Sequence, residues 1–306
     1  MDNALIIKGL NVTYSDGNRT KKIINDLNLT VPCGKITAIV GESGSGKTMT
    51  AMAVFGLTPP NVETSGDIYL NSELISALPA AKKEKLRGRD IVLIPQSGAD
   101  FLDPSMNILS QMSESLRLIA PKKSKAELEK KAVSLLESVG LGAEILNKYP
   151  HQLSGGMAQK VILAIALSSS PKLVIADEPT RGVDEADAEE FVDKMREVFS
   201  ESAVAVITHN IAIAQKSDRI AVMFAGEIAE TGTSAEVLKD PQHEYTKVLL
   251  KSLAENGFRV DEKKNGQSLG GCAYYLRCPA PLDICKTTKP PYSEKERSAR
   301  CFKFKM

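Results

Sequence analysis

The sequence predicts an α/β fold built around a parallel, doubly wound β-sheet. The run KITAIVG at 35–41 passes through a glycine-rich loop into the helical stretch MTAMAVFGL at 49–57. The runs LVIADE at 173–178 and AVAVITH at 203–209 have the apolar composition of buried strands, and a predicted helix at 184–200 separates them. Strands that alternate with helices in this way form parallel sheets with helices on their faces.

The N-terminal part of the chain predicts a separate antiparallel β subdomain. Residues 4–14 and 21–31 alternate apolar and polar side chains, and the turn-forming residues SDGN at 15–18 lie between them. Short strands are predicted next at 66–71 and 91–96.

The middle of the chain predicts a helical subdomain. Residues 104–167 are mainly helical in pattern and include the charged amphipathic stretch SKAELEKKAVSLLESVG at 124–140. A β-hairpin is predicted at 219–233 and a last helix at 243–254.

The length of 306 residues exceeds the usual size of one domain. We expect an α/β domain at 1–255 followed by a small cysteine-rich appendage at 256–306, with the polar, glycine-bearing stretch 255–271 as the linker. The hydrophobic fraction of 42% and the charged fraction of 25% are those of an ordinary globular protein. The net charge of +1 gives no support to nucleic-acid binding.

No stretch of the sequence approaches the roughly 20 consecutive apolar residues that span a bilayer. The start MDNALIIKGL is too polar and too short for a signal peptide. We therefore expect a cytoplasmic protein whose contact with any membrane comes through a partner.

The glycine-rich loop matches the pattern G-x-x-x-x-G-K-[ST] at every fixed position. Its residues expected to surround phosphate groups are Gly41, Ser43, Gly44, Ser45, Gly46, Lys47 and Thr48. Small residues let successive backbone N–H groups curl around phosphates, and the following helix directs its positive N-terminal end toward them. Lys47 supplies a charge to the β- and γ-phosphates, and Thr48 offers a hydroxyl to Mg²⁺. A glycine turn without a ligand is the alternative interpretation of this loop.

Two adjacent carboxylates, Asp177 and Glu178, end the strand LVIADE. The carboxyl edge of a parallel sheet is where bound phosphates lie. Asp177 is therefore predicted to hold Mg²⁺, and Glu178 to orient and deprotonate an attacking water. Alone, the pair would more often be the acidic start of a helix with Pro179 in its first turn.

Residues 153–157, LSGGM, closely resemble the signature motif of ABC ATPases. The resemblance implies a P-loop NTPase (RecA-like) core that binds ATP. In that family Ser154, Gly155 and Gly156 would contact the γ-phosphate of ATP held by a second ATPase subunit, so that hydrolysis requires a dimer.

Other residues resemble family elements in the family's order. Gln96 is similar to the glutamine that senses Mg²⁺ and nucleotide, and His209 to the histidine near the γ-phosphate. Tyr14 is similar to the aromatic residue that stacks on adenine, and Asp184 to the aspartate after the acidic strand. Taken singly, each has an ordinary structural explanation, as a capped polar residue at a strand end or as core packing.

Four positions differ from the commonest family pattern: Met157, Lys160, Asn210 and the residues 181–183 before Asp184. The last difference raises the possibility that the second ATPase subunit is a non-identical sister. Because Glu178 and His209 are both present, the half-site of this chain is expected to hydrolyse ATP.

Four of the five cysteines lie in the last 35 residues, at positions 272, 278, 285 and 301. From the spacing of Cys272, Cys278, Cys285 and Cys301 alone, an iron–sulfur cluster, a zinc ion and no metal are equally acceptable.

The sequence around these cysteines is similar to the C-terminal region of the ATPases of oligopeptide, dipeptide and nickel permeases. The similar residues are Gly271-Cys272, Arg277-Cys278, Cys285 and the following Pro-Pro. The resemblance implies a [4Fe–4S] cluster on the four cysteines.

The same resemblance implies partners and a place in the cell. The partners are two integral-membrane permease subunits, an extracytoplasmic solute-binding protein and a sister ATPase. The protein would lie peripherally on the cytoplasmic face of the plasma membrane and energise uptake of di- or oligopeptides. A nickel or metal-chelate importer and a non-transport ABC ATPase are the alternatives.

Overall fold

The computed structural model describes residues 3–17, 19–96, 101–180, 185–256, 270–292 and 295–304. The strands of these residues are β1 (Asn3–Ser15), β2 (Thr20–Pro32), β3 (Ile36–Val40), β4 (Val62–Leu70), β5 (Glu73–Leu74), β6 (Ile91–Ile94), β7 (Leu173–Asp177), β8 (Ala203–Thr208), β9 (Arg219–Phe224), β10 (Glu227–Thr233) and β11 (Ser298–Ala299). The α-helices are α1 (Lys47–Phe55), α2 (Ala80–Leu86), α3 (Ile108–Ile119), α4 (Lys125–Ser138), α5 (Gly155–Leu167), α6 (Glu185–Val198), α7 (Ile211–Lys216), α8 (Ser234–Lys239) and α9 (Glu244–Asn256).

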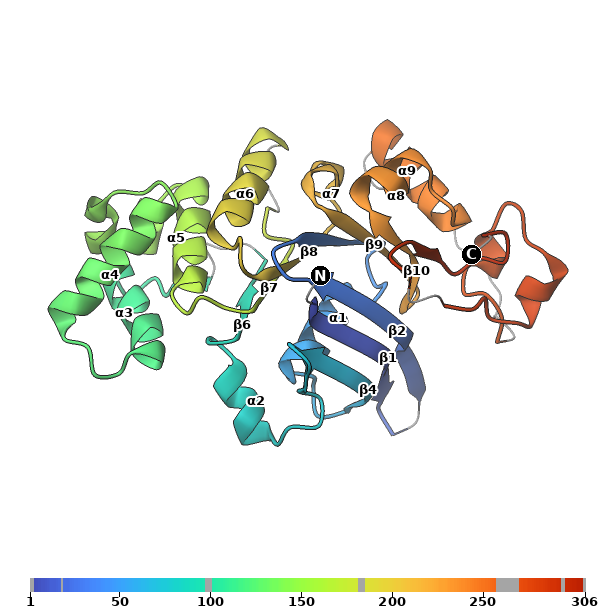
Figure 1. Cartoon of the computed structure of the whole chain (residues 1–306), viewed down its shortest axis with the longest axis horizontal. Coiled ribbons are helices and arrows are strands. Elements are labelled where there is room, and N and C mark those ends of the chain that lie inside the picture. The colour runs from blue at the N-terminus through green and yellow to red at the C-terminus, as the bar shows by residue number, and fades with distance from the viewer. Residues whose placement is uncertain are drawn as a thin grey trace.

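The described strands form two sheets, which Figure 1 shows side by side in the middle of the molecule. A seven-stranded sheet has the order β11-β10-β9-β3-β8-β7-β6, and a four-stranded antiparallel sheet has the order β2-β1-β4-β5. In the larger sheet β6, β7, β8, β3 and β9 run parallel, whereas β10 pairs antiparallel with both β9 and β11. The predicted α/β fold is confirmed, with a mixed rather than wholly parallel sheet.

The central strands are apolar because helices and the second sheet cover both of their faces. All residues of β3 and β8 are buried, and in β7 only Asp177 at the end is partly exposed. Strands covered on both faces have continuous apolar runs of this kind. The same runs deliver the polar residues that follow them to one edge of the sheet.

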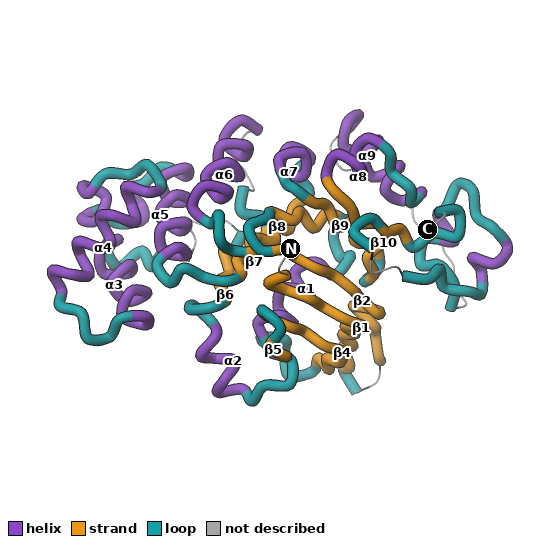
Figure 2. The backbone as a smooth tube through the Cα atoms, in the orientation of Figure 1, coloured by secondary structure: helices purple, strands orange, loops and turns teal. Residues whose placement is uncertain are grey.

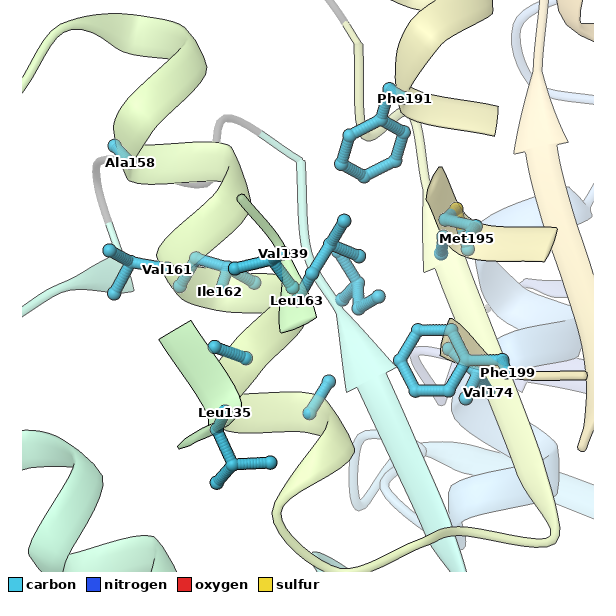
Figure 3. Packing of buried hydrophobic residues seen from close by; sticks show 14 of the residues in the cluster. Leu135, Val139, Ala158, Val161, Ile162, Leu163, Val174, Phe191, Met195 and Phe199 are labelled. Atoms are coloured by element: carbon cyan, nitrogen blue, oxygen red, sulfur yellow. The ribbon is translucent and has the colours of Figure 1, made fainter. Parts of the chain in front are cut away.

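Helices α3, α4 and α5 gather at one end of the molecule, where Figure 2 shows little but helix. Helix α4 begins with a capping box between Ser124 and Glu127, in agreement with the predicted start of the amphipathic stretch. Side chains of α4, α5 and α6, among them Leu135, Leu163 and Phe191, meet Val174 of β7 in one apolar cluster (Figure 3). The helical subdomain is therefore packed firmly against the core that carries the strand ends.

The C-terminal segment, described at 270–292 and 295–304, packs against the main sheet. Its strand β11 pairs with β10, and the ring of Tyr274 is buried with Phe224 and Tyr245. Arg300, which is 4% exposed, donates hydrogen bonds to Asp26 of β2. The stretch 257–269 of the predicted linker lies outside the described residues, and the boundary at 255/256 stays a prediction.

Within the described part of the chain, no helix is both long and apolar enough to cross a membrane.

Candidate active site

A cavity of about 820 Å³ lies at the carboxyl edge of the parallel strands. Its polar lining consists of residues that the sequence predicts to be functional: Gly41, Ser43, Gly44, Gly46, Lys47, Thr48, Gln96, Asp177, Glu178 and His209. They follow the ends of β3, β6, β7 and β8, or end β7 itself, so four strands deliver them to one place. Crevices at the carboxyl ends of parallel strands are the usual ligand sites of α/β proteins.

The loop before α1 requires glycine for two different reasons. A Cβ on Gly41 would lie 2.1 Å from the carbonyl oxygen of Met223, which leaves no room for any side chain. Gly46 has a φ of 106°, a conformation that L-residues with side chains rarely adopt. Ser45, in the same loop, is buried at 3% exposure and is not among the residues that line the cavity.

Lys47 is folded back onto the loop in this structure. Its Nζ donates to the carbonyl oxygens of Gly41 at 2.7 Å and Glu42 at 3.0 Å. Burial lowers the pKa of Lys47, while the carboxylates of Glu178, Asp177 and Glu42 oppose that effect. These neighbours favour the charged ammonium in a place where a phosphate could replace the loop carbonyls as its partner.

Asp177 and Thr48 form the second part of the polar lining. Burial raises the pKa of the Asp177 carboxyl, whereas a hydrogen bond from Thr48 and the charge of Lys47 lower it. Gln96, Thr48 and Asp177 all line the same cavity, and each carries a side-chain oxygen atom. Hard oxygen ligands are those that Mg²⁺ takes in nucleotide sites, so this set fits the ion.

Glu178 has a backbone conformation that residues other than glycine rarely adopt. Its φ is 49°, in the left-handed region, and its N–H donates to the carbonyl oxygen of Ile207 at 2.8 Å. Such conformations cost on the order of 1 kcal/mol or more for a residue other than glycine, and they gather at functional sites.

The imidazole of His209 is the partner of the Glu178 side chain. The Nδ1 atom of His209 lies 2.7 Å from Oε2 of Glu178, which is 18% exposed. A carboxylate fixed in this way at a cavity wall can accept a proton from water.

The residues that resemble the signature motif, Ser154, Gly155 and Gly156, lie at the N-terminus of α5. Ser154 caps the N-terminus of α5 and accepts a hydrogen bond from the backbone N–H of Met157 at 3.3 Å. Gly155 and Gly156 are exposed, with open space where a Cβ would lie. None of these three residues lines the cavity. The chain thus presents two separate surfaces of the kind that bind phosphate, a loop in the cavity and an exposed helix N-terminus.

Two other predicted residues are not part of the described cavity lining. Tyr14 lies in β1 opposite Lys21 of β2 and Val62 of β4, and its predicted stacking role stays a prediction. Asp184 lies outside the described residues. Conversely, the apolar wall of the cavity was not predicted; it consists of Ile23, Met49, Met52, Leu57 and Pro59. Ile23 lies in β2, and the other four lie in α1 or just after it, so closeness to the glycine loop is the signal that could have found those four.

The predicted iron–sulfur cluster, and with it the metal-binding role of the tail, is wrong. Cys272, Cys278, Cys285 and Cys301 border one small cavity of about 20 Å³, a volume suited to a single water molecule. In the described part of the chain, no three His, Cys, Asp or Glu side chains are arranged to hold a metal ion.

Two of these cysteines pack against an apolar cluster. Cys272 and Cys278 lie against the cluster that includes Tyr274 and Val237. Burial there raises the pKa of Cys272 to about 11 and also raises the pKa of Cys278.

A glycine loop with its lysine, an acidic strand end and a carboxylate held by a histidine define a P-loop nucleoside triphosphatase. Residues 24–181 match the family model "ABC transporter", and residues 229–285 match the model "Oligopeptide/dipeptide transporter, C-terminal region".

Known transport ATP-binding proteins are similar in sequence to nearly the whole chain. The chain is 35% identical to the oligopeptide transport ATP-binding protein OppD of Escherichia coli, over 99% of this chain and 94% of that protein. It is 34% identical to the dipeptide transport ATP-binding protein DppD of Bacillus subtilis, over 95% and 91%. A solved structure of the ATP-binding cassette MJ0796, a dimer in a post-hydrolysis state with ADP and Pi, matches with a TM-score of 0.66 and 27% identity. That match covers 75% of this chain and 98% of the cassette.

The chain therefore belongs to the ABC transporter family, in the branch of the oligopeptide/dipeptide transport ATP-binding proteins. This confirms the predicted family and the prediction that the protein is an ATPase.

Proposed function

We propose that this chain is the ATP-hydrolysing subunit of an importer for di- and oligopeptides. The observation that carries the proposal is the gathering of Lys47, Asp177 and Glu178 around one cavity in a chain whose relatives are peptide transport ATP-binding proteins. The names of these relatives favour peptides over nickel as the transported substrate.

The geometry suggests a role in ATP hydrolysis for each polar residue that lines the cavity. ATP binding would draw Lys47 from the carbonyls of Gly41 and Glu42 to the phosphates, while the loop N–H groups enclose them. Glu178 would orient the attacking water and accept its proton, and His209 holds the carboxylate in place. Thr48, Gln96 and Asp177 would hold Mg²⁺, which neutralises charge that develops on the phosphates.

We further propose a head-to-tail pair of ATPase subunits. Ser154, Gly155 and Gly156 are exposed at the N-terminus of α5 and turned to solvent, so a second subunit can offer its ATP to them. The dimeric state of MJ0796 supports this arrangement. The residues 181–183 differ from the common family pattern, which suggests a non-identical sister as the second subunit.

A groove of about 370 Å³ suits contact with a permease. It lies between β6, α3 and α5, and it is lined by Phe101, Leu102, Met106, Leu118 and Ile162, among others. Phe101 is 62% exposed and Leu118 is 53% exposed, an unusual display of large apolar side chains. Gln96 lies two residues after the end of β6, and Leu93 and Pro95 line this groove, so movement at the nucleotide site would reach it.

The proposal includes two integral-membrane permease subunits, an extracytoplasmic solute-binding protein and a peripheral position on the cytoplasmic membrane face. These partners follow from the importer type of the relatives. Hydrolysis would remove the γ-phosphate that joins the two ATPase subunits, and so favour their separation.

Uptake into membrane vesicles tests the substrate. Vesicles that contain the assembled importer and ATP on the ATPase side should accumulate a radiolabelled di- or oligopeptide delivered with the solute-binding protein. Vesicles with Lys47→Met in this chain should not. Accumulation of nickel without peptide uptake would overturn the peptide assignment while leaving the ATPase role intact.

A further inference from the structure

Arg277, in the C-terminal segment, contacts the phosphate-binding loop although 235 residues separate it from Glu42. Its Nη2 lies 2.7 Å from Oε1 of Glu42, and its Nη1 lies 3.0 Å from Oε2. This two-pronged contact fixes both the distance and the orientation of the carboxylate. The side chains are only 15% and 23% exposed, so water screens the pair weakly.

Aromatic rings hold the guanidinium of Arg277 in its place. Its Cζ lies 5.2 Å from the ring centre of Phe224 and 5.7 Å from that of Tyr274. The two rings pack edge to face, with their centres 5.1 Å apart. Cations over aromatic rings at such distances are attracted to them. Arg277 is therefore a fixed partner for Glu42 and not a loose surface side chain.

Tyr245 ties the backbone of the same loop residue to the same group of rings. The backbone N–H of Glu42 donates to the Tyr245 hydroxyl at 3.0 Å. Tyr245 is fully buried, and its ring centre lies 5.5 Å from that of Tyr274. The backbone and the side chain of Glu42 are thus both held by residues that lie far along the chain.

Glu42 is an unfavourable residue for a loop that binds phosphates. Glu42 lies between Gly41 and Ser43, which line the cavity, and its backbone carbonyl oxygen accepts a hydrogen bond from Lys47. The charge of its carboxylate also acts on Lys47. An unpaired carboxylate at this place would repel the negative charges of a nucleoside triphosphate. The guanidinium of Arg277 neutralises that carboxylate and keeps it directed to the C-terminal segment.

We propose that Arg277 is a positioning residue for the phosphate-binding loop, through which the C-terminal segment sets the affinity of the cavity for ATP. The proposal does not depend on which substrate the importer carries. It assigns to the C-terminal segment a role in nucleotide binding by this chain itself.

The test is the affinity of the purified full-length chain for ATP and ADP, measured by competition with a fluorescent ATP analogue. Arg277→Met should weaken ATP binding roughly tenfold and ADP binding less, because ATP carries more negative charge. Adding Glu42→Gln to the Arg277→Met variant should restore ATP affinity to within about twofold of the unaltered chain. The second change removes the carboxylate charge of Glu42, which the first change leaves without a partner. Arg277→Gln, which keeps a polar group but no charge, replaces Arg277→Met if that variant does not fold.

Arg300 provides a matched control. It also joins the C-terminal segment to a carboxylate, with Nη2 2.8 Å from Oδ2 of Asp26, and lies over an aromatic ring, Tyr292, at 5.3 Å. Arg300→Met should lower thermal stability and leave ATP affinity unchanged.

Three outcomes would overturn the proposal. ATP binding by Arg277→Met could equal that of the unaltered chain. The Glu42→Gln change could fail to restore it. Arg300→Met could cause the same loss of ATP affinity.

Discussion

The imidazole of His209 and the carboxylate of Glu178 are 2.7 Å apart, from Nδ1 to Oε2, although they follow different strands. Glu178 comes directly after β7 and His209 directly after β8, and these strands are parallel neighbours in the sheet. The contact therefore follows from strand order, and it places a held carboxylate in the wall of the nucleotide cavity.

Replacing His209 should separate ATP binding from ATP hydrolysis. In His209→Ala, Glu178 loses the partner that orients it, so hydrolysis by the assembled complex should fall roughly 10²- to 10⁴-fold. The affinity for ATP should change by no more than about threefold, because the loop and Lys47 are untouched. Steady-state ATPase assays and nucleotide competition measure the two quantities. A parallel loss of both would assign His209 to binding instead.

The exposed start of α5 should matter only when a second subunit is present. Gly155→Asp adds a carboxylate where the structure has open space, and an acidic residue in the first turn of a helix stabilises it. The chain should fold and bind ATP normally, but the assembled complex should lose roughly 100-fold or more of its ATPase activity by repulsion of the partner's γ-phosphate. Gly155→Asn, nearly the same in shape without the charge, should lose much less. Equal losses for Asp and Asn would argue against a phosphate at this place.

Buried His243 should make stability fall in mild acid. Burial lowers its pKa to about 4, from 6.5, and its Nδ1 accepts from the backbone N–H of Tyr245 at 3.0 Å. Between these values the unfolded chain binds the proton and the folded chain does not, so the free energy of unfolding decreases as the pH falls from about 6.5 to about 4. The loss approaches about 3 kcal/mol at the lower end.

Urea unfolding at several pH values measures this effect. His243→Gln should remove most of the dependence between about pH 6.5 and pH 4. His151→Gln, a change at an exposed histidine, should leave it unaltered. An unchanged slope in His243→Gln would assign the acid sensitivity to other groups.

Local chemistry made part of the site predictable from the sequence. The glycine pattern of the loop is local in sequence, and the left-handed φ at Gly46 belongs to that turn, although the close approach that requires Gly41 comes from the distant Met223. Asp177 and Glu178 could be placed because a buried apolar strand delivers whatever residue follows it to the sheet edge. The α/β class followed from the same runs.

Contacts between distant segments were not predictable in this way. The pairing of Arg277 with Glu42 depends on how the C-terminal segment folds back onto β10, and no periodicity records that. The cysteines misled for a related reason. The family resemblance implied ligation, but the four cysteines border a cavity of about 20 Å³, and Cys272 and Cys278 pack against the apolar cluster around Tyr274.

The rate of ATP hydrolysis by the Glu178→Gln variant is the most direct test of the central claim. That claim is that this chain uses the Glu178 carboxylate to hydrolyse ATP and so drives a transporter. The amide keeps the shape of the side chain but cannot accept the proton of water. In the assembled complex, the variant should bind ATP with nearly unaltered affinity and hydrolyse it at least about 100-fold more slowly. Glu129→Gln, an exposed change on α4, should behave like the unaltered chain. Undiminished ATP hydrolysis by Glu178→Gln would contradict the claim.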